Sequence, residues 1–188
     1  MGCRRLTSLS ILLVFWEIKP ITSSQKVTVD LEKFEQTLGF DLVNATGITV
    51  TKFNATTYVL NGTTETFQDF ADDHMYSISM AHSKTYGNFK EWPFKVVRQT
   101  PCQFLNGVYK DYQKYIVDYS NLPRVGDERY CPFRAGTYWV KEWTTGTDWV
   151  VPIAPAGYWR FTADLLDKNE KIVMQLQAYI KLMRKGVL

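Results

Sequence analysis

Residues 157–182 read GYWRFTADLLDKNEKIVMQLQAYIKL, and this stretch decides the fold. Before the turn DKNE (167–170), every second side chain is apolar, at Trp159, Phe161, Ala163 and Leu165. After the turn, apolar residues again occupy alternate positions, at Ile172, Met174, Leu176, Ala178, Ile180 and Leu182. Alternation with period two over this length predicts two antiparallel strands, each with one buried and one solvated face.

Shorter stretches nearer the N-terminus carry the same strand signal. MYSISM from Met75 and FKVVRQ from Phe94 both alternate. In TTYVLNGTTETF (56–67), the dipeptide Asn61-Gly62 stands between two runs rich in β-forming residues. Asn-Gly is a strong signal for a two-residue hairpin turn, so we predict a β-hairpin with its turn at these residues.

One segment has a helical period instead. From Cys102 to Tyr119, apolar and aromatic residues recur at steps of three and four: Leu105, Val108, Tyr109, Tyr112, Tyr115, Ile116 and Tyr119. This spacing predicts an amphipathic helix that ends at Ser120-Asn121, before Pro123. Short strands with no alternating β-α-β pattern predict an all-β antiparallel sandwich with one inserted amphipathic helix.

Residues 1–24 have the layout of a secretory signal peptide. Arg4 and Arg5 precede a short apolar run from Leu6 to Trp16, and Thr22 and Ser24 supply small residues before a cleavage site. The run is too short to span a bilayer. The alternative is a buried N-terminal strand or helix. We expect an extracellular protein whose residues 25–188 form one sandwich domain.

Loss of this segment changes the charge. It removes Arg4, Arg5, Lys19 and Glu17, so the net charge falls from +3 to +1. No basic patch of the kind that holds a phosphate backbone is left, and we expect no nucleic-acid partner. No other apolar run approaches the length of a membrane span, so we expect none in the mature chain.

The segment also removes Cys3, which leaves only Cys102 and Cys131. Two cysteines in an oxidising compartment usually pair, and we predict a disulfide between them. Such a bond constrains the unfolded chain by roughly 3–4 kcal/mol on the entropy model. The alternative is two free, buried thiols.

Three Asn-x-Thr sequons lie within twenty residues of one another. They begin at Asn44, Asn54 and Asn61. Behind a signal peptide, such sequons are glycosylation sites on a solvent-facing surface. We expect glycan on at least one of them, with Asn61 the weakest candidate because of its predicted turn.

No pattern in the sequence indicates catalysis or a cofactor. The two histidines, His74 and His82, are eight residues apart, or roughly 26 Å on a strand, which is too far for one metal ion. His-Glu-x-x-His and Gly-x-Ser-x-Gly motifs are absent from the sequence, and a disulfide would leave no thiol nucleophile. We therefore predict a protein that is not an enzyme and has no metal site.

The excess of apolar and aromatic side chains has two interpretations. They are either ordinary packed core or the wall of an apolar pocket between the sheets, and periodicity does not distinguish the two. On the second interpretation, the candidate ligand-binding residues are Trp139, Trp159, Phe161, Leu165, Met174, Leu176 and Ile180.

Three stretches resemble a known family: PCQFLNGVYKDYQKYIVDYSNLP (101–123), CPFRAGTYWVKEW (131–143) and VPIAPAGYWRFTADL (151–165). They are similar to the insect CheB chemosensory proteins, which are in turn similar to the ML lipid-recognition group that includes ganglioside activators. The resemblance implies an immunoglobulin-like sandwich whose sheets part to hold a lipid, and a role in gustatory or pheromone perception. Ganglioside activators carry several disulfides whereas this chain can form one, and no individual ligand-contact residue carries over by motif.

The leading hypothesis is thus a secreted, non-enzymatic carrier or presenter of an apolar lipid, cuticular hydrocarbon or pheromone, acting in chemosensory perception with a sensory receptor as a further partner. The alternative is an extracellular interaction module with a packed core that binds a receptor through its surface. A carrier should contain an internal void, whereas a module should expose a contiguous apolar patch.

Overall fold

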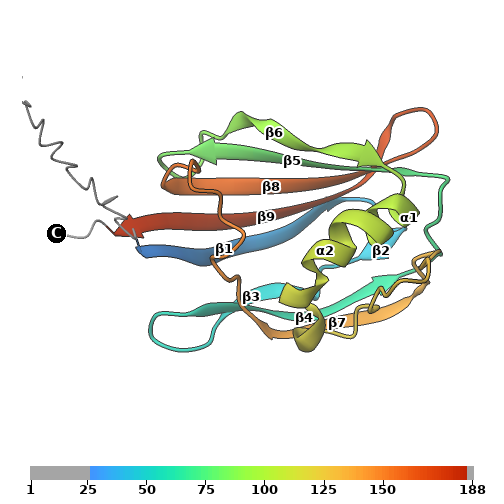
Figure 1. The fold of residues 1–188 in the computed structure, drawn as a ribbon, viewed down its shortest axis with the longest axis horizontal. Helices are drawn as coiled ribbons and strands as arrows, with labels where there is room; N and C mark the ends of the chain where they lie inside the picture. Colours follow the sequence, from blue (N-terminus) through green and yellow to red (C-terminus); the bar gives the residue numbers. More distant parts are fainter. Residues whose placement is uncertain (1–25, 186–188) are drawn as a thin grey trace, which may run out of the picture.

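The computed structural model describes residues 26–185, and the predicted signal peptide lies outside this range. Two antiparallel sheets face each other, with one helical segment beside the gap between them (Figure 1). The strands are β1 (Lys26–Leu38), β2 (Val43–Asn44), β3 (Thr49–Lys52), β4 (Tyr58–Thr66), β5 (Met75–Ser83), β6 (Lys90–Gln99), β7 (Gly136–Trp143), β8 (Gly157–Leu166) and β9 (Ile172–Lys185). This arrangement confirms the predicted all-β sandwich.

The larger sheet contains the β8–β9 hairpin that the alternating sequence predicts. Its strand order is β1-β9-β8-β5-β6, with every neighbour antiparallel. Trp159 pairs with Ile180, so the two predicted apolar sets lie on one face. Ile172 is the exception: a register shift between Leu165 and Leu166 displaces it, and it is exposed.

The smaller sheet shows that the predicted hairpin turn at Asn61-Gly62 is wrong. Strand β4 runs straight through both residues and pairs with β3 and β2 along one edge and with β7 along the other. Gly62 has a φ of +131°, and a Cβ atom there would lie 1.8 Å from the carbonyl oxygen of Gly47. Glycine is required because another backbone passes close to β4, and not because the chain reverses.

The predicted helix is present but irregular. It consists of α1 (Pro101–Phe104), a π-helical turn (Leu105–Tyr109), α2 (Lys110–Tyr112) and two 3₁₀ turns (Gln113–Tyr115 and Val117–Tyr119). Its first turn is fixed by a capping box, in which the Thr100 hydroxyl accepts from the Gln103 N–H and the Gln103 side chain accepts from the Thr100 N–H. We call residues 101–119 the helical segment.

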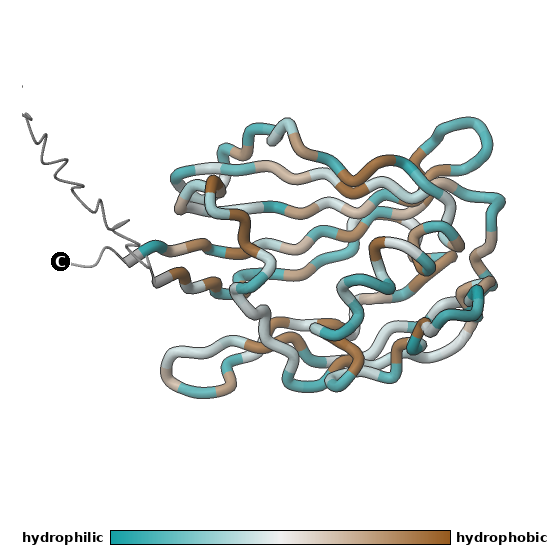
Figure 2. Tube along the Cα trace, viewed as in Figure 1, coloured by the Kyte–Doolittle hydropathy of each residue, from teal (hydrophilic) through white to brown (hydrophobic). Residues whose placement is uncertain are grey.

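The interior of the sandwich divides into two apolar clusters along the β8–β9 hairpin. One cluster contains Leu165 and Met174, near the turn of the hairpin, and the other contains Trp159, Ile180 and Leu182, at its open end. In Figure 2 hydrophobic stretches recur along the strands and on the helical segment, whereas the β8–β9 turn is hydrophilic. Within residues 26–185, no helix has the length and apolar character needed to cross a bilayer.

Candidate functional site

An apolar cavity of about 430 Å³ lies between the sheets beside the cluster that contains Leu165 and Met174. Both sheets contribute to its walls, and the helical segment closes the side that faces the viewer in Figure 1. From the larger sheet the lining residues are Phe34, Tyr76, Leu165, Met174 and Leu176. From the smaller sheet they include Val43, Leu60, Thr64, Thr66, Tyr138, Trp139 and Val140.

The structure divides the seven predicted ligand-binding residues into two groups. Four of them line the cavity: Trp139, Leu165, Met174 and Leu176. The other three, Trp159, Phe161 and Ile180, lie in or against the second apolar cluster, where they pack on other side chains. Apart from Trp139 of β7, these residues lie on one continuous face of the β8–β9 hairpin, which passes from the cavity into the packed cluster, so alternation alone did not separate them.

The sequence interpretation did not include the lining residues of the helical segment. These are Pro101, Phe104, Leu105, Tyr109 and Ile116. Three of them belong to the three-and-four spacing that predicted the helix, and this spacing already marked the face that would turn inward. Thr64 and Thr66 were also missed, because the predicted hairpin placed them on a separate strand after a turn.

No Asp, Glu, Lys, Arg or His side chain is among the described residues that line the cavity. The hydroxyls of Tyr109 and Tyr138 donate hydrogen bonds to the carbonyl oxygens of Pro123 and Arg134, each at 2.7 Å. Burial raises the pKa of Tyr76 to about 12, with a smaller contribution from the nearby Asp164 carboxylate. The tyrosines therefore stay neutral at physiological pH, and the cavity suits an uncharged occupant.

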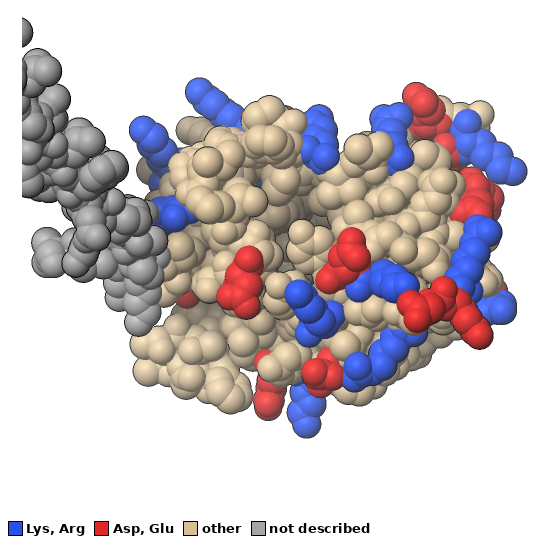
Figure 3. All heavy atoms as spheres, viewed as in Figure 1, with Lys and Arg blue, Asp and Glu red and all other residues tan. Residues whose placement is uncertain are grey.

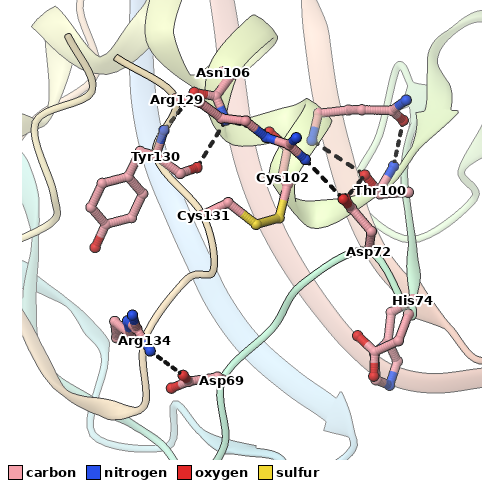
Figure 4. Close-up of a disulfide and its surroundings, with 12 residues drawn as sticks. Asp69, Asp72, His74, Thr100, Cys102, Asn106, Arg129, Tyr130, Cys131 and Arg134 are labelled. Carbon is pink, nitrogen blue, oxygen red and sulfur yellow. Dashed lines mark hydrogen bonds and ion pairs between the residues drawn. A yellow bond between two sulfur atoms is a disulfide. The ribbon is translucent and has the colours of Figure 1, made fainter.

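Part of the cavity wall comes from a strap, residues 129–135, that is fastened at both ends to the loop of residues 69–74. Arg129 pairs with Asp72 at 2.9 Å and Arg134 with Asp69 at 2.8 Å, as Figure 4 shows. Between them, Phe70 and Phe133 exchange two backbone hydrogen bonds, and both rings line the cavity. The Ala135 N–H and the Arg134 guanidinium lower the pKa of Asp69, so the Asp69 carboxylate that pairs with Arg134 stays ionised near neutral pH.

The disulfide ties this strap to the helical segment. Cys102 and Cys131 are bonded, with their Cα atoms 5.3 Å apart, which confirms the predicted pairing (Figure 4). The Asn106 side chain supports the same junction by donating to the carbonyl of Tyr130 and accepting from its N–H, both at 2.8 Å. The strap and the helical segment therefore form one connected wall of the cavity.

Trp139 marks the rim. It lines the cavity, yet 42% of its surface is exposed to solvent. Its backbone N–H donates to the Asn121 side chain at 2.6 Å, and the Asn121 amide donates to the Thr137 carbonyl at 3.0 Å. Asn121, just after the helical segment, is thus bonded to β7 and fixes the position of Trp139 at the rim of the cavity. Figure 3 shows charges of both signs scattered over this face and a hollow above the helical segment, bordered mainly by uncharged atoms.

The side chains that suggested metal or acid–base chemistry have structural contacts. Asp72, Cys102 and Cys131 place possible ligand atoms within 4.8 Å of one another, but both sulfurs are in the disulfide. His74 precedes β5 and His82 lies near its far end, so the strand separates them. His74 packs on a phenylalanine ring and His82 on two tryptophan rings.

The three sequon asparagines differ in accessibility. Asn44 and Asn54 are exposed, and their side-chain oxygens accept only from residues of their own sequon loops. Asn61 lies in the middle of β4, where its amide donates to Thr51 at 2.7 Å and its oxygen accepts from the Glu142 N–H at 2.6 Å. A glycan on Asn61 would be attached to this same amide nitrogen, which is held within the sheet.

Part of the chain matches a known family. Residues 76–161, from β5 into β8, match a family described as protein of unknown function (DUF1091). The matched range contains the helical segment, the strap and β7, which together supply one side of the cavity. No curated protein matches the chain.

Proposed function

We propose that this protein is a secreted, non-enzymatic carrier or presenter of an apolar lipid or hydrocarbon, which it holds in the cavity between its sheets. The observation that carries the proposal is the cavity itself, about 430 Å³ in volume, with no charged side chain among the described residues that line it. Small-molecule sites commonly fall between roughly 300 and 1,000 Å³ and are mostly apolar. A packed interaction module has no need of such a void.

The energetics favour a long-chain ligand. Transfer of each methylene group from water into an apolar site contributes about 0.8 kcal/mol. An alkyl ligand that fills the cavity buries many methylene groups, and their summed transfer free energy offsets the entropy lost on association. Met174, with its flexible thioether, lets the wall adapt to ligands of slightly different shape.

We further propose a role in chemosensory perception, with a sensory receptor as the partner of the loaded protein. The support is the resemblance to the CheB proteins. The three stretches that carry it lie between residues 101 and 165, almost entirely within the matched range of residues 76–161.

The proposed extracellular location has a direct test in the sequons. Protein expressed in insect cells should carry glycan on Asn44 or Asn54, because both are exposed and lie outside the cavity wall. Asn61 should remain unmodified because its amide is bonded within the sheet. Glycosidase treatment followed by peptide mass spectrometry measures this, and unmodified asparagines at all three positions would count against secretion.

The function itself is tested by co-purification. Oxidised protein is incubated with dodecane or dodecanol, passed through a gel-filtration column, and the protein fraction is extracted for gas chromatography. We expect near-stoichiometric ligand with the wild type and a marked loss with Leu176→Trp, which places a large ring in the cavity from a half-buried position. Ile180→Val, in the packed cluster, is the matched control and should retain ligand. Absence of every apolar ligand from the wild-type fraction would refute the carrier function.

One observation favours the second candidate, an extracellular interaction module. On the face of the larger sheet that points away from the cavity, Tyr86, Phe89, Tyr158 and Tyr179 form a cluster with ring centroids 5.5–6.0 Å apart. Tyr86 is half exposed, and the Lys181 amine lies 5.4 Å from the Tyr158 ring. If the protein binds no apolar ligand and Tyr86→Ala abolishes its binding to sensory cells, this surface carries the function instead.

A further inference from the structure

Five of the described residues that line the cavity carry a hydroxyl group, and these groups are not equivalent. The Tyr109 and Tyr138 hydroxyls donate to backbone carbonyls. The Thr64 Oγ1 atom is completely enclosed, so an occupant of the cavity does not reach it. Thr66 and Tyr76 remain. Neither of their hydroxyls has a hydrogen-bond partner among the described residues, and neither is completely enclosed as Thr64 Oγ1 is.

The Thr66 and Tyr76 side chains both belong to the interior of the sandwich. Thr66 lines the cavity and is only 4% exposed. Tyr76 pairs with Leu165 across β5 and β8, which places its side chain on the cavity face of the larger sheet, and its ring packs on Phe104 of the helical segment with the centroids 4.7 Å apart. Burial raises the pKa of Tyr76 to about 12, so its hydroxyl keeps its proton. Most polar atoms in protein interiors are paired, so these two groups are available to a polar atom of an occupant.

The two unpaired hydroxyls lie toward one end of the cavity and come from opposite sheets. Thr66 is the last residue of β4, and Tyr76 is the second residue of β5, just after the loop of residues 69–74, at the right-hand end of the sandwich in Figure 1. Leu60, which also lines the cavity, lies six residues before Thr66 on β4, or roughly 20 Å along an extended strand. The cavity therefore has unpaired hydroxyls at one end and an apolar wall toward the other.

From this arrangement we infer that the cavity binds long-chain compounds with an uncharged oxygen at one end, such as a primary alcohol, and holds that oxygen at Thr66 and Tyr76. This inference rests on the proposed carrier function and adds the position of the polar group and the orientation of the ligand. A plain alkane would leave both hydroxyls unpaired. A carboxylate would meet no cation among the described lining residues, and burial of an unpaired charge is strongly unfavourable.

The test compares four ligands of one chain length in three proteins. Affinities of dodecane, dodecan-1-ol, dodecan-6-ol and dodecanoic acid are measured by displacement of N-phenylnaphthylamine and confirmed by co-purification. The proteins are the wild type, the double variant Thr66→Val with Tyr76→Phe, and the double variant Thr28→Val with Tyr158→Phe. The last is the matched control, because it removes the same two groups from β1 and β8 at positions outside the cavity lining. Tyr76→Phe alone is measured as well, so that the test stands if the double variant fails to fold.

We expect the wild type to prefer dodecan-1-ol over both dodecane and dodecan-6-ol. In the Thr66 and Tyr76 variant, the preference over dodecane should fall roughly tenfold, the equivalent of one hydrogen bond, and the preference over dodecan-6-ol should disappear. Both preferences should be unchanged in the control variant. Ratios of affinities are compared between proteins, which cancels the different water solubilities of the ligands. Dodecanoic acid should bind the wild type more weakly than dodecan-1-ol at neutral pH.

Several results would overturn the inference while leaving the carrier function intact. One is an unchanged preference for dodecan-1-ol when the Thr66 and Tyr76 hydroxyls are removed, and another is an equal loss of preference in the control variant. Equal affinity of the wild type for the two alcohols would contradict a polar end, and equal binding of dodecanoic acid would contradict selection of an uncharged oxygen. Failure of all the ligands to bind the wild type would instead remove the carrier function on which the inference rests.

Discussion

At Gly62 a single missing side chain decides how the smaller sheet is built. The Asn-Gly pair is a turn signal because glycine tolerates positive φ. Here the positive φ serves a register shift in β4 opposite β7, and the missing Cβ lets the Gly47 backbone pass. The sequence signal for positive φ at Gly62 was correctly recognised. Its structural consequence depended on Gly47, which is distant in the sequence but adjacent in space, and a local sequence pattern does not contain this information.

Replacing Gly62 with alanine should therefore destabilise the protein severely. The new Cβ would meet backbone atoms that cannot move aside, and the φ of +131° is strained for any L side chain. We expect a loss of about 3 kcal/mol or more in the free energy of unfolding, measured by urea denaturation. Gly107→Ala is the control: apart from its own helix backbone and chain neighbours, no atom lies within 4 Å of the added Cβ, and the position is helical. An equal effect of the two substitutions would contradict the close approach of the two backbones.

At the scale of elements, the helical segment and the strap depend on each other. The disulfide and the Asn106 side chain join them, and both contribute rings or side chains to the cavity wall. Two cysteines in a chain that we expected to be secreted were enough to predict the bond. The sequence did not indicate that the bond closes a cavity, because the path of residues 120–135 has no periodic pattern.

Removal of the disulfide tests this connection. The double substitution Cys102→Ala and Cys131→Ala should lower the free energy of unfolding by about 3 kcal/mol, because the unfolded chain gains freedom. It should also weaken retention of an apolar ligand, since one wall is no longer fastened. Denaturation and co-purification measure the two effects. If the double variant kept wild-type stability and ligand retention, the disulfide would not be required to hold the strap against the helical segment.

Strand β9 offers a second test, because it passes through both apolar clusters. Leu176 lines the cavity and is half buried, whereas Ile180 is fully packed. Ile180→Ala should cost about 2–5 kcal/mol, as for other packed residues, while Leu176→Ala should cost no more than about 2 kcal/mol because its side chain already borders a void. Thermal or urea unfolding gives both values. A larger cost at Leu176 would mean that the cavity is closed in solution.

Across the whole molecule, the sandwich is packed at one end and hollow at the other. The class of fold, the β8–β9 hairpin and the helix could be predicted from the periodicity of apolar residues. The disulfide could be predicted from the number of cysteines and the expected oxidising compartment. Four of the seven predicted ligand-binding residues line the cavity. The remaining three could not be separated from them, because a cavity wall and a packed core demand the same apolar alternation. The cavity is also closed on one side by the helical segment, and the position of that segment against the sheets is a property of the assembled fold.

The most direct measurement of ligand binding in the cavity is a methyl-resolved NMR titration of the protein with dodecanol. We predict large shifts for the methyl groups of Leu165, Met174 and Leu176, which line the cavity. The methyl groups of Ile180 and Leu182, in the packed cluster, should remain nearly unchanged and serve as an internal control. Shifts confined to Ile180 and Leu182 or to surface residues, or no shifts at saturating ligand, would contradict binding between the sheets.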